Sequence, residues 1–399
     1  MNSKKSTYSF VILILGFMVA FAGSYPQFQL SALSYLIIPN LNLSISQFSS
    51  IFSGSMVPGI LLSLVSGLLC DRFGVKRCIS FAGLVASAGT ILRIWSFNYI
   101  TLLICMVLSG VGASFLNSNI SKLLSKWVPA EKIGTMIGIV LAGTTASQVV
   151  GMATTAYFPS VNSAYIVAAM ISVLVAVLWI LFAKEAPSGL GSNEKVVEIP
   201  KQSLMDNLKI VIRNPHIWCV GICLMFMLGS IIALSAFLPL ALQSECGFSA
   251  QSAGTITSVI MGGSLVGTIV GPIWCEKSGN LKIFLCVFGM VAGLGTAFAW
   301  TLPIGVLMLV AMFITGFTSN AIVPIMISIP IRLNGISFEC AGTAGGVVAT
   351  IQLLGAIMIP TYIISPIAGS NYSLFFILAG VSAALCGLVA FALPNLKKQ

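Results

Sequence analysis

The chain has 399 residues, of which 58% are hydrophobic and only 7% are charged, and its mean hydropathy is +1.06. Soluble proteins carry about 25% charged residues to cover their surface, so this composition excludes an ordinary soluble protein and indicates an integral membrane protein. The formal net charge of +10 does not indicate nucleic-acid binding, because the basic residues fall in short loops between apolar runs.

Twelve apolar runs follow one another, each near the ~20 residues that a bilayer requires. They predict membrane-spanning helices over residues 9–35, 46–70, 78–97, 99–124, 133–157, 163–183, 216–242, 250–275, 281–301, 304–331, 340–365 and 372–393. No β-type alternation competes with this pattern. The first run resembles a signal peptide, but the many later runs favour an uncleaved first helix. The fold class expected is therefore an all-α membrane protein with twelve transmembrane helices.

The longest polar stretch, residues 184–215, predicts a cytoplasmic linker between two halves, 1–183 and 216–399. Its last part, from Ser203 to Arg213, has apolar residues among charges and predicts an amphipathic helix. The segment that begins at Glu131 is echoed by the one that begins at Glu339, each at the start of the fifth run of its half. This repeat favours two pseudo-symmetric six-helix bundles.

The basic residues predict the orientation. All of the 19 Lys and Arg residues except Arg93 fall on one side of the expected membrane. This positive-inside pattern places both termini in the cytoplasm and favours a multi-pass protein of the plasma (inner) membrane. Arg93, near the outer end of the third run, has two interpretations. Its guanidinium reaches the outer headgroups, or it steers or gates an anion at the outer mouth.

No group for metal or catalytic chemistry is expected within the membrane. The ten Cys residues are scattered singly and there is one His, so neither a disulfide framework nor a zinc site is predicted. All nine Asp and Glu residues lie outside the expected spans, which argues against an enzyme and against a carboxylate proton relay. No cofactor or metal is expected.

Neutral polar side chains are the candidate substrate contacts. Tyr25 and Gln29 are four residues apart, so they share one face of the first helix, and Pro26 between them is expected to kink it. The other candidates are Asn117, Gln148, Asn320 and Gln352. Each could instead be a hydrogen-bonded packing residue between helices. Gly134, Gly138, Gly342 and Gly346 are expected to form close helix–helix seams.

One charged loop carries a family likeness. Gly67-x-Leu69-x-Asp71-Arg72-x-Gly74-x-Lys76-Arg77 resembles the signature loop between helices two and three of the major facilitator superfamily. Glu276-Lys277-Ser278-Gly279-Asn280-Leu281-Lys282 resembles a degraded second copy. In this family the loop is a cytoplasmic gate, and the central cavity is lined mainly by helices one, four, seven and ten. All the candidate residues lie on those helices or on the supporting helices five and eleven.

The resemblance also implies contacts for the gate. Asp71 is expected to face the amino end of helix eleven near Cys340, and Arg72 and Arg77 are expected to meet Glu339 or Glu131. Two features depart from common family patterns. Met106 stands where many proton-coupled members carry arginine, and the stretch from Gly138 to Gly151 lacks the proline of drug–proton antiporters.

The function implied is secondary active or facilitative transport of a small solute by alternating access. A neutral or zwitterionic metabolite is the first expectation, and a small organic or inorganic anion, carried by a permease or antiporter, is the alternative. Drug efflux is the third. A membrane sensor that does not transport is the rival from another class. The expected partners are the small-molecule substrate and the lipid bilayer, with no nucleic acid, and the protein is expected to be a monomer.

Overall fold

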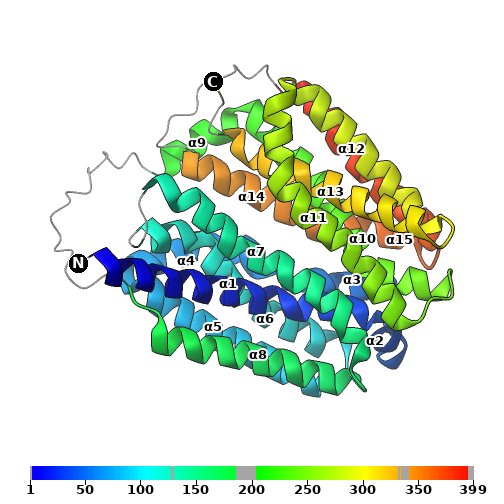
Figure 1. The fold of residues 1–399 in the computed structure, drawn as a ribbon, viewed down its shortest axis with the longest axis horizontal. Coiled ribbons are helices and arrows are strands. Elements are labelled where there is room, and N and C mark those ends of the chain that lie inside the picture. Colours follow the sequence, from blue (N-terminus) through cyan, green and yellow to red (C-terminus); the bar gives the residue numbers. More distant parts are fainter. Residues whose placement is uncertain are drawn as a thin grey trace. The chain divides into compact units, whose positions relative to one another are not determined.

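The computed structural model describes residues 2–125, 127, 130–185, 204–330, 333 and 341–393. Within these ranges every regular element is a helix (Figure 1). Eleven helices are long and apolar enough to cross a membrane, and the number becomes twelve if one bent pair, α3 and α4, is counted as a single span. The predicted all-α membrane fold is confirmed, and the chain is a multi-pass membrane protein.

The chain divides into two compact units, Met1–Leu43 with Ile51–Val196, and Ser44–Ser50 with Val197–Gln399. The helices up to residue 185 are α1 (Asn2–Ala32), α2 (Ser34–Asn40), α3 (Ile45–Gly54), α4 (Val57–Phe73), α5 (Val75–Leu92), η1 (Arg93–Trp95), α6 (Tyr99–Ser125), α7 (Ala130–Thr154), η2 (Thr155–Tyr157) and α8 (Val161–Phe182). Figure 1 shows α1, α7 and α8 running along one another in the first unit.

The second unit holds the first part of α3, within Ser44–Ser50, and the remaining helices. They are α9 (Leu204–Arg213), α10 (Pro215–Ser244), α11 (Ala250–Ser278), α12 (Leu281–Phe298), η3 (Ala299–Thr301), α13 (Val306–Ser328), α14 (Ala341–Met358), η6 (Ile359–Ile364), α15 (Ser365–Ala368), α16 (Tyr372–Val389) and η7 (Ala390–Ala392). The η6 segment is a π-helix that contains Pro360, which cannot donate a backbone hydrogen bond and so favours such an irregularity.

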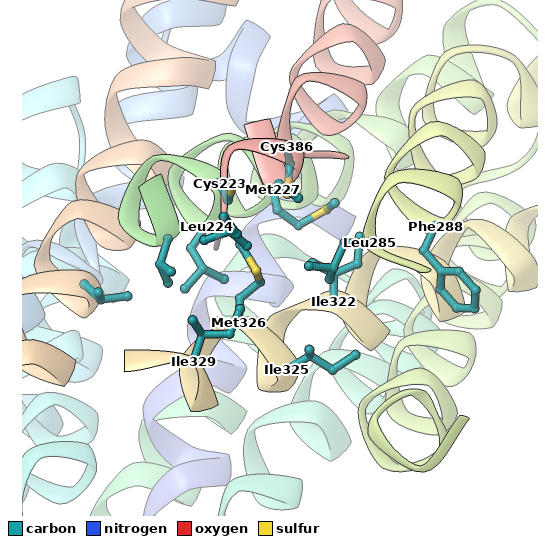
Figure 2. Packing of buried hydrophobic residues seen from close by; sticks show 14 of the residues in the cluster. Cys223, Leu224, Met227, Leu285, Phe288, Ile322, Ile325, Met326, Ile329 and Cys386 are labelled. Atoms are coloured by element: carbon teal, nitrogen blue, oxygen red, sulfur yellow. The ribbon is translucent and has the colours of Figure 1, made fainter. Parts of the chain in front are cut away.

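The core of the second unit is apolar, and most of the helices of that unit contribute to it. Figure 2 shows Leu224 and Met227 of α10, Leu285 of α12, and Ile322 and Met326 of α13 pointing toward one another. All five side chains are fully buried. Cys386 of α16 completes the cluster as a small buried side chain with no disulfide partner.

Glycines allow α11 and α13 to approach closely. Gly263, Gly267 and Gly271 lie four residues apart on one face of α11. A Cβ atom added at Gly267 would collide with the carbonyl oxygen of Phe317 on α13, and a Cβ at Gly263 would collide with that of Phe313. This is the small-residue packing that lets membrane helices make backbone contact.

The sequence predicted close helix–helix packing at other glycines, on α7 and α14. Nothing approaches within 4 Å of a Cβ added at Gly138 of α7 or at Gly346 of α14. The prediction of close packing at these two positions is therefore wrong, because a four-residue glycine spacing fixes only a shared face and not what that face meets. Side-chain surroundings at Gly134 and Gly342 lie outside what the structure describes.

Candidate functional site

The second predicted span, residues 46–70, is interrupted. It consists of α3 and α4, which are bent by 43° at Ser55 and Met56. Pro58 is the local cause, because it has no N–H and leaves the carbonyl of Gly54 without its helical donor. Tighter turns replace the regular pattern, with Met56 N donating to Ser53 O and Gly59 N donating to Met56 O, both at 2.9 Å.

Helix α6 supports the interruption from one side. A Cβ atom at Gly110 would collide with the carbonyl oxygen of Ser55, so the two backbones are in direct contact there. One turn away, Ser114 Oγ donates to Pro58 O at 3.0 Å. The hydroxyl of Ser55 is itself buried, and it has no hydrogen-bond partner in the described ranges.

Helix α1 brings Gln27 to the same level. A Cβ at Gly23 would lie 2.6 Å from that of Ala113, and Arg93 bridges Pro26 to Met106. Helices α1 and α6 therefore run antiparallel. Gln27 lies level with the part of α6 from Met106 to Gly110. The next residue, Phe28, packs its ring edge-on against Phe52 of α3, with 5.7 Å between the ring centroids.

Gln27 was missed by the sequence analysis, which selected Gln29 for its four-residue spacing from Tyr25. Only 4% of Gln27 is exposed, and its Nε2 has no partner in the described part of the chain. The signal available in the sequence was that Gln27 stands four residues after Gly23, so both lie on the face of α1 that packs closely against α6. Of the two glutamines of α1, it is therefore Gln27 whose amide donor is unpaired among the described residues.

Gln29 and Tyr25 lie on the other face of α1, inside the first unit. Gln29 is fully buried and donates from Nε2 to the carbonyl of Ala164 on α8 at 2.7 Å. Tyr25 is 2% exposed and stacks on Phe21, with 5.6 Å between the ring centroids. These contacts connect α1 to α8 and to its own preceding turn, which is the packing role weighed against substrate contact in the sequence analysis.

Arg93 is buried, with 1% of its surface exposed. Nη2 donates to Gln29 Oε1 at 2.5 Å, and Nη1 donates to Pro26 O at 2.9 Å. The guanidinium carbon lies 4.0 Å from the ring centroid of Tyr165, a cation–π contact. The expectation that Arg93 reaches the outer headgroups is wrong, because α1 and α8 supply acceptors and an aromatic face inside the unit. Its Nε has no partner among the described residues.

No carboxylate neutralises Arg93 among the described residues. Its hydrogen bonds are to a backbone carbonyl, an amide oxygen and the Met106 sulfur. The acids of the first unit's sequence are Asp71, Glu131, Glu185 and Glu194. Of these, Glu185 binds the amino end of α5, whereas Arg93 follows its carboxyl end about 27 Å away. Among the described residues, the charge is therefore held by neutral hydrogen-bond acceptors and by the ring of Tyr165.

The other candidate amides differ in their surroundings. Asn117 is exposed on α6, and Gln148 of α7 and Gln352 of α14 are half-buried. Asn320 of α13 donates from Nδ2 to Ser264 Oγ on α11 at 2.8 Å, which joins two helices of the second unit. Their participation in a substrate cavity stays a prediction.

One groove on the surface of the first unit is apolar. It encloses about 440 Å³ between α5 and α8, along Ile91, Ile94, Ile166, Met170 and Val173. A substrate site needs a few polar groups to orient its ligand. This groove has none on its lining side chains, so it suits a lipid acyl chain and not a polar substrate.

The signature loop is held by a residue that the sequence analysis did not select. Glu185, which follows α8, accepts hydrogen bonds from Val75 N and Lys76 N, both at 2.9 Å. These are the first N–H groups of α5, so the carboxylate satisfies unpaired donors at the positive end of the helix. Gly74 has φ +88°, and a Cβ there would lie 3.0 Å from Glu185 Oε2, so glycine is required at this turn.

The predicted gate residues are only partly described. Arg72 and Arg77 are exposed, Lys76 is half-buried, and Gly67 has no atom within 4 Å of an added Cβ. Glu276 and Lys277 of the second copy are exposed at the end of α11. The side chain of Asp71 and all of Glu339 lie outside the described residues, so their gate contacts stay a prediction.

Glu185→Gln is expected to destabilise the first unit by about 1–2 kcal/mol, because a neutral amide loses the charge-assisted bonds to two helix N–H groups. Thermal unfolding of the purified protein in detergent measures this. Glu276→Gln, at an exposed position, serves as the matched control and should leave the melting temperature unchanged. Equal melting temperatures for the two variants would refute the role assigned to Glu185.

The family profile of the Major Facilitator Superfamily matches residues 12–360. The chain belongs to the Major Facilitator Superfamily. The likeness first suggested by the loop at Gly67 to Arg77 is thereby confirmed, and the protein is a transporter rather than an enzyme. As a superfamily member it binds small-molecule substrates within a membrane.

Curated relatives of this superfamily member are named transporters. The hexuronate transporter of Bacillus subtilis is 29% identical over 195 residues, which are 48% of this chain and 44% of that protein. The chain thus spans less than half of that relative's length in the match. The probable sulfoacetate transporter SauU of Cupriavidus necator is 23% identical over 95% of this chain and 92% of its own.

Solved structures agree on the fold. A bacterial homologue of the human lysosomal transporter Spinster, in an inward-facing occupied conformation, matches with a TM-score of 0.78 at 14% identity. The match covers 98% of this chain and 97% of that one. The nucleoside transporter NupG matches with a TM-score of 0.75 at 12% identity. At these identities the likeness concerns the fold alone.

Proposed function

We propose that this superfamily member transports small anions, with carboxylates as the main class. The observation that carries the proposal is the guanidinium of Arg93, which is buried without a carboxylate partner in the described ranges. An ionised side chain inside a membrane protein costs several kcal/mol and marks a functional site by default. An anion that passes nearby recovers part of that cost.

The field of Arg93 extends to the opposite face of α1. Its guanidinium bonds to Pro26 and Gln29 of that helix, whose diameter is about 10 Å. At an effective dielectric constant of about 20, two unit charges at this separation interact by roughly 1.7 kcal/mol. This is enough to favour an anion over its neutral analogue by about one order of magnitude.

The names of the relatives support the same class. They include transporters of hexuronate, sulfoacetate and cis,cis-muconate, all of which are carboxylates. The cis,cis-muconate transport protein of Acinetobacter baylyi is 24% identical over 87% of this chain. Several other relatives are also named as carriers of anions, nitrite among them.

A second candidate substrate class is a neutral or zwitterionic metabolite. The observation that favours it is the half-buried, uncharged amides of Gln148 and Gln352 on α7 and α14. A substrate bound only by neutral amides would show no preference for a carboxylate over its amide. Drug efflux has no specific observation in its favour.

We further propose that the protein works as a monomer in the plasma membrane with both termini in the cytoplasm. The distribution of basic residues supports this orientation. All nine acids of the sequence lie outside the expected spans, so we expect uniport or anion exchange instead of coupling to protons through a membrane carboxylate.

Flux into proteoliposomes tests the proposed function. The purified protein is offered matched pairs of a carboxylate and its amide, from formate and formamide through benzoate and benzamide to a hexuronate and its amide. We expect uptake of at least one carboxylate with little uptake of its amide, and no uphill accumulation driven by a pH gradient alone. Equal uptake of both members of every pair, or uptake only of the amides, would refute anion transport.

A further inference from the structure

Near the interruption between α3 and α4 lie two buried polar atoms that lack a hydrogen-bond partner in the described part of the chain. They are Gln27 Nε2 and Ser55 Oγ. We propose that this junction of α1, α3, α4 and α6, defined here as the helix-break site, binds the carboxylate group of the transported anion. The inference rests on the proposed function and deepens it, because it assigns the position in the first unit where the anionic group is held.

Packing places the two groups in one junction. Ser55 lies against Gly110 of α6, and Gln27 lies level with the same part of α6. The contact between Phe28 and Phe52 joins the neighbours of Gln27 on α1 to the last turn of α3. Gln27 therefore lies on the face of α1 that meets α6, at the level where α6 contacts the interruption of the second span.

The helix-break site offers hydrogen-bond donors that lack acceptors. Gln27 is 4% exposed, and its Nε2 has no acceptor among the described residues. A buried donor without an acceptor is costly, so an added oxygen atom at this position is favourable. The hydroxyl of Ser55 can donate to the same oxygen. Two unpaired donors at one junction are suited to the oxygen atoms of a carboxylate.

The backbone favours negative charge at this position. Helix α4 has 17 residues and begins at the interruption, and no side chain caps its amino end. Its dipole places a partial positive charge there. Backbone carbonyl oxygens at the break would repel an anion, but two of them are occupied. Ser53 O accepts a hydrogen bond from Met56 N, and Ser55 O faces Gly110. Interrupted helices hold anionic substrate groups in this way in other transporters.

The two units differ in their unpaired groups. Seven buried side-chain atoms lack a hydrogen-bond partner among the described residues, and all of them belong to the first unit. In the second unit, the side chains of Asn320 and Ser264 bond to each other. The helix-break site thus has open hydrogen-bonding capacity in the unit that also holds the charge of Arg93.

The test is equilibrium binding to the full-length protein in detergent, measured for the carboxylate that gives the largest flux and for its amide. Gln27→Met removes the N–H donor at similar volume, and Ser55→Ala removes the hydroxyl. Each is expected to weaken carboxylate binding about fivefold or more. Two controls remove side chains that hydrogen-bond to a carbonyl of their own helix: Ser109→Ala removes a hydroxyl, and Gln243→Met removes an amide. Both controls should bind the carboxylate with the affinity of the wild type.

Gln27→Glu provides a second readout that does not depend on lost packing, because a negative charge at the helix-break site should abolish carboxylate binding while amide binding is retained. Unchanged carboxylate affinity in all three variants would overturn the proposal and indicate that ordered water fills the site. That result, obtained with a wild type that transports carboxylates, would leave the proposed function intact. A wild type that carries no carboxylate would instead refute the proposed function.

Discussion

Gly267→Leu is expected to prevent the second unit from folding. A side chain at this position would collide with the carbonyl oxygen of Phe317, and neighbouring glycines on both sides of Gly267 make equally close contacts with α13. Relief requires the two helix backbones to separate along their whole seam. We expect a loss of about 3 kcal/mol or more of unfolding free energy, because overpacking at backbone contact cannot be absorbed by a rotamer change.

Gly262→Leu is the matched control for this prediction. Gly262 lies on the same helix five residues away, but nothing approaches within 4 Å of a Cβ there. The readouts are the amount of monodisperse protein recovered in detergent and its melting temperature. The control should resemble the wild type, whereas Gly267→Leu should give little folded protein. Similar recovery of the two variants would contradict the seam between α11 and α13.

Arg93→Gln is expected to raise the KM for a transported carboxylate about tenfold, since it removes the roughly 1.7 kcal/mol of attraction across α1. It should also lower the free energy of unfolding by about 1–3 kcal/mol, because the carbonyl of Pro26 or the amide oxygen of Gln29 is left without a donor. The substitution also removes the cost of burying a charge, which offsets part of the decrease in the free energy of unfolding.

Two variants separate charge from packing at Arg93. Arg93→Lys keeps the charge but cannot reproduce the planar fork that bonds two acceptors, so it should lower the melting temperature while the KM changes less than threefold. Lys282→Gln removes a charge from the amino end of α12 and should change neither the melting temperature nor the KM. A KM that rises equally in Arg93→Lys and Arg93→Gln would show that Arg93 acts only through packing.

The fold was largely predictable from the sequence. Lipid imposes a minimum length of apolar residues on each span, so the runs over residues such as 163–183 and 372–393 predicted α8 and α16 closely. The signature loop at Gly67 to Arg77 predicted the family. These features depend on local composition and spacing, which do not require knowledge of which helices touch.

The candidate site was less predictable because it depends on packing. Pro58 is visible in the sequence, but many membrane helices contain proline without a break, and Pro26 lies inside the continuous α1. The choice between Gln27 and Gln29 required knowing which face of α1 meets α8. Arg93 stood out by its position, but its burial depends on acceptors from Pro26 and Gln29, nearly 70 residues earlier in the chain.

The most direct test of anion transport is the ratio of initial uptake rates for a carboxylate and its amide, measured in the same liposomes at equal concentration. For the wild type the ratio should be well above 10, and in Arg93→Gln it should fall by about tenfold. A wild-type ratio near 1 that Arg93→Gln leaves unchanged would contradict the account.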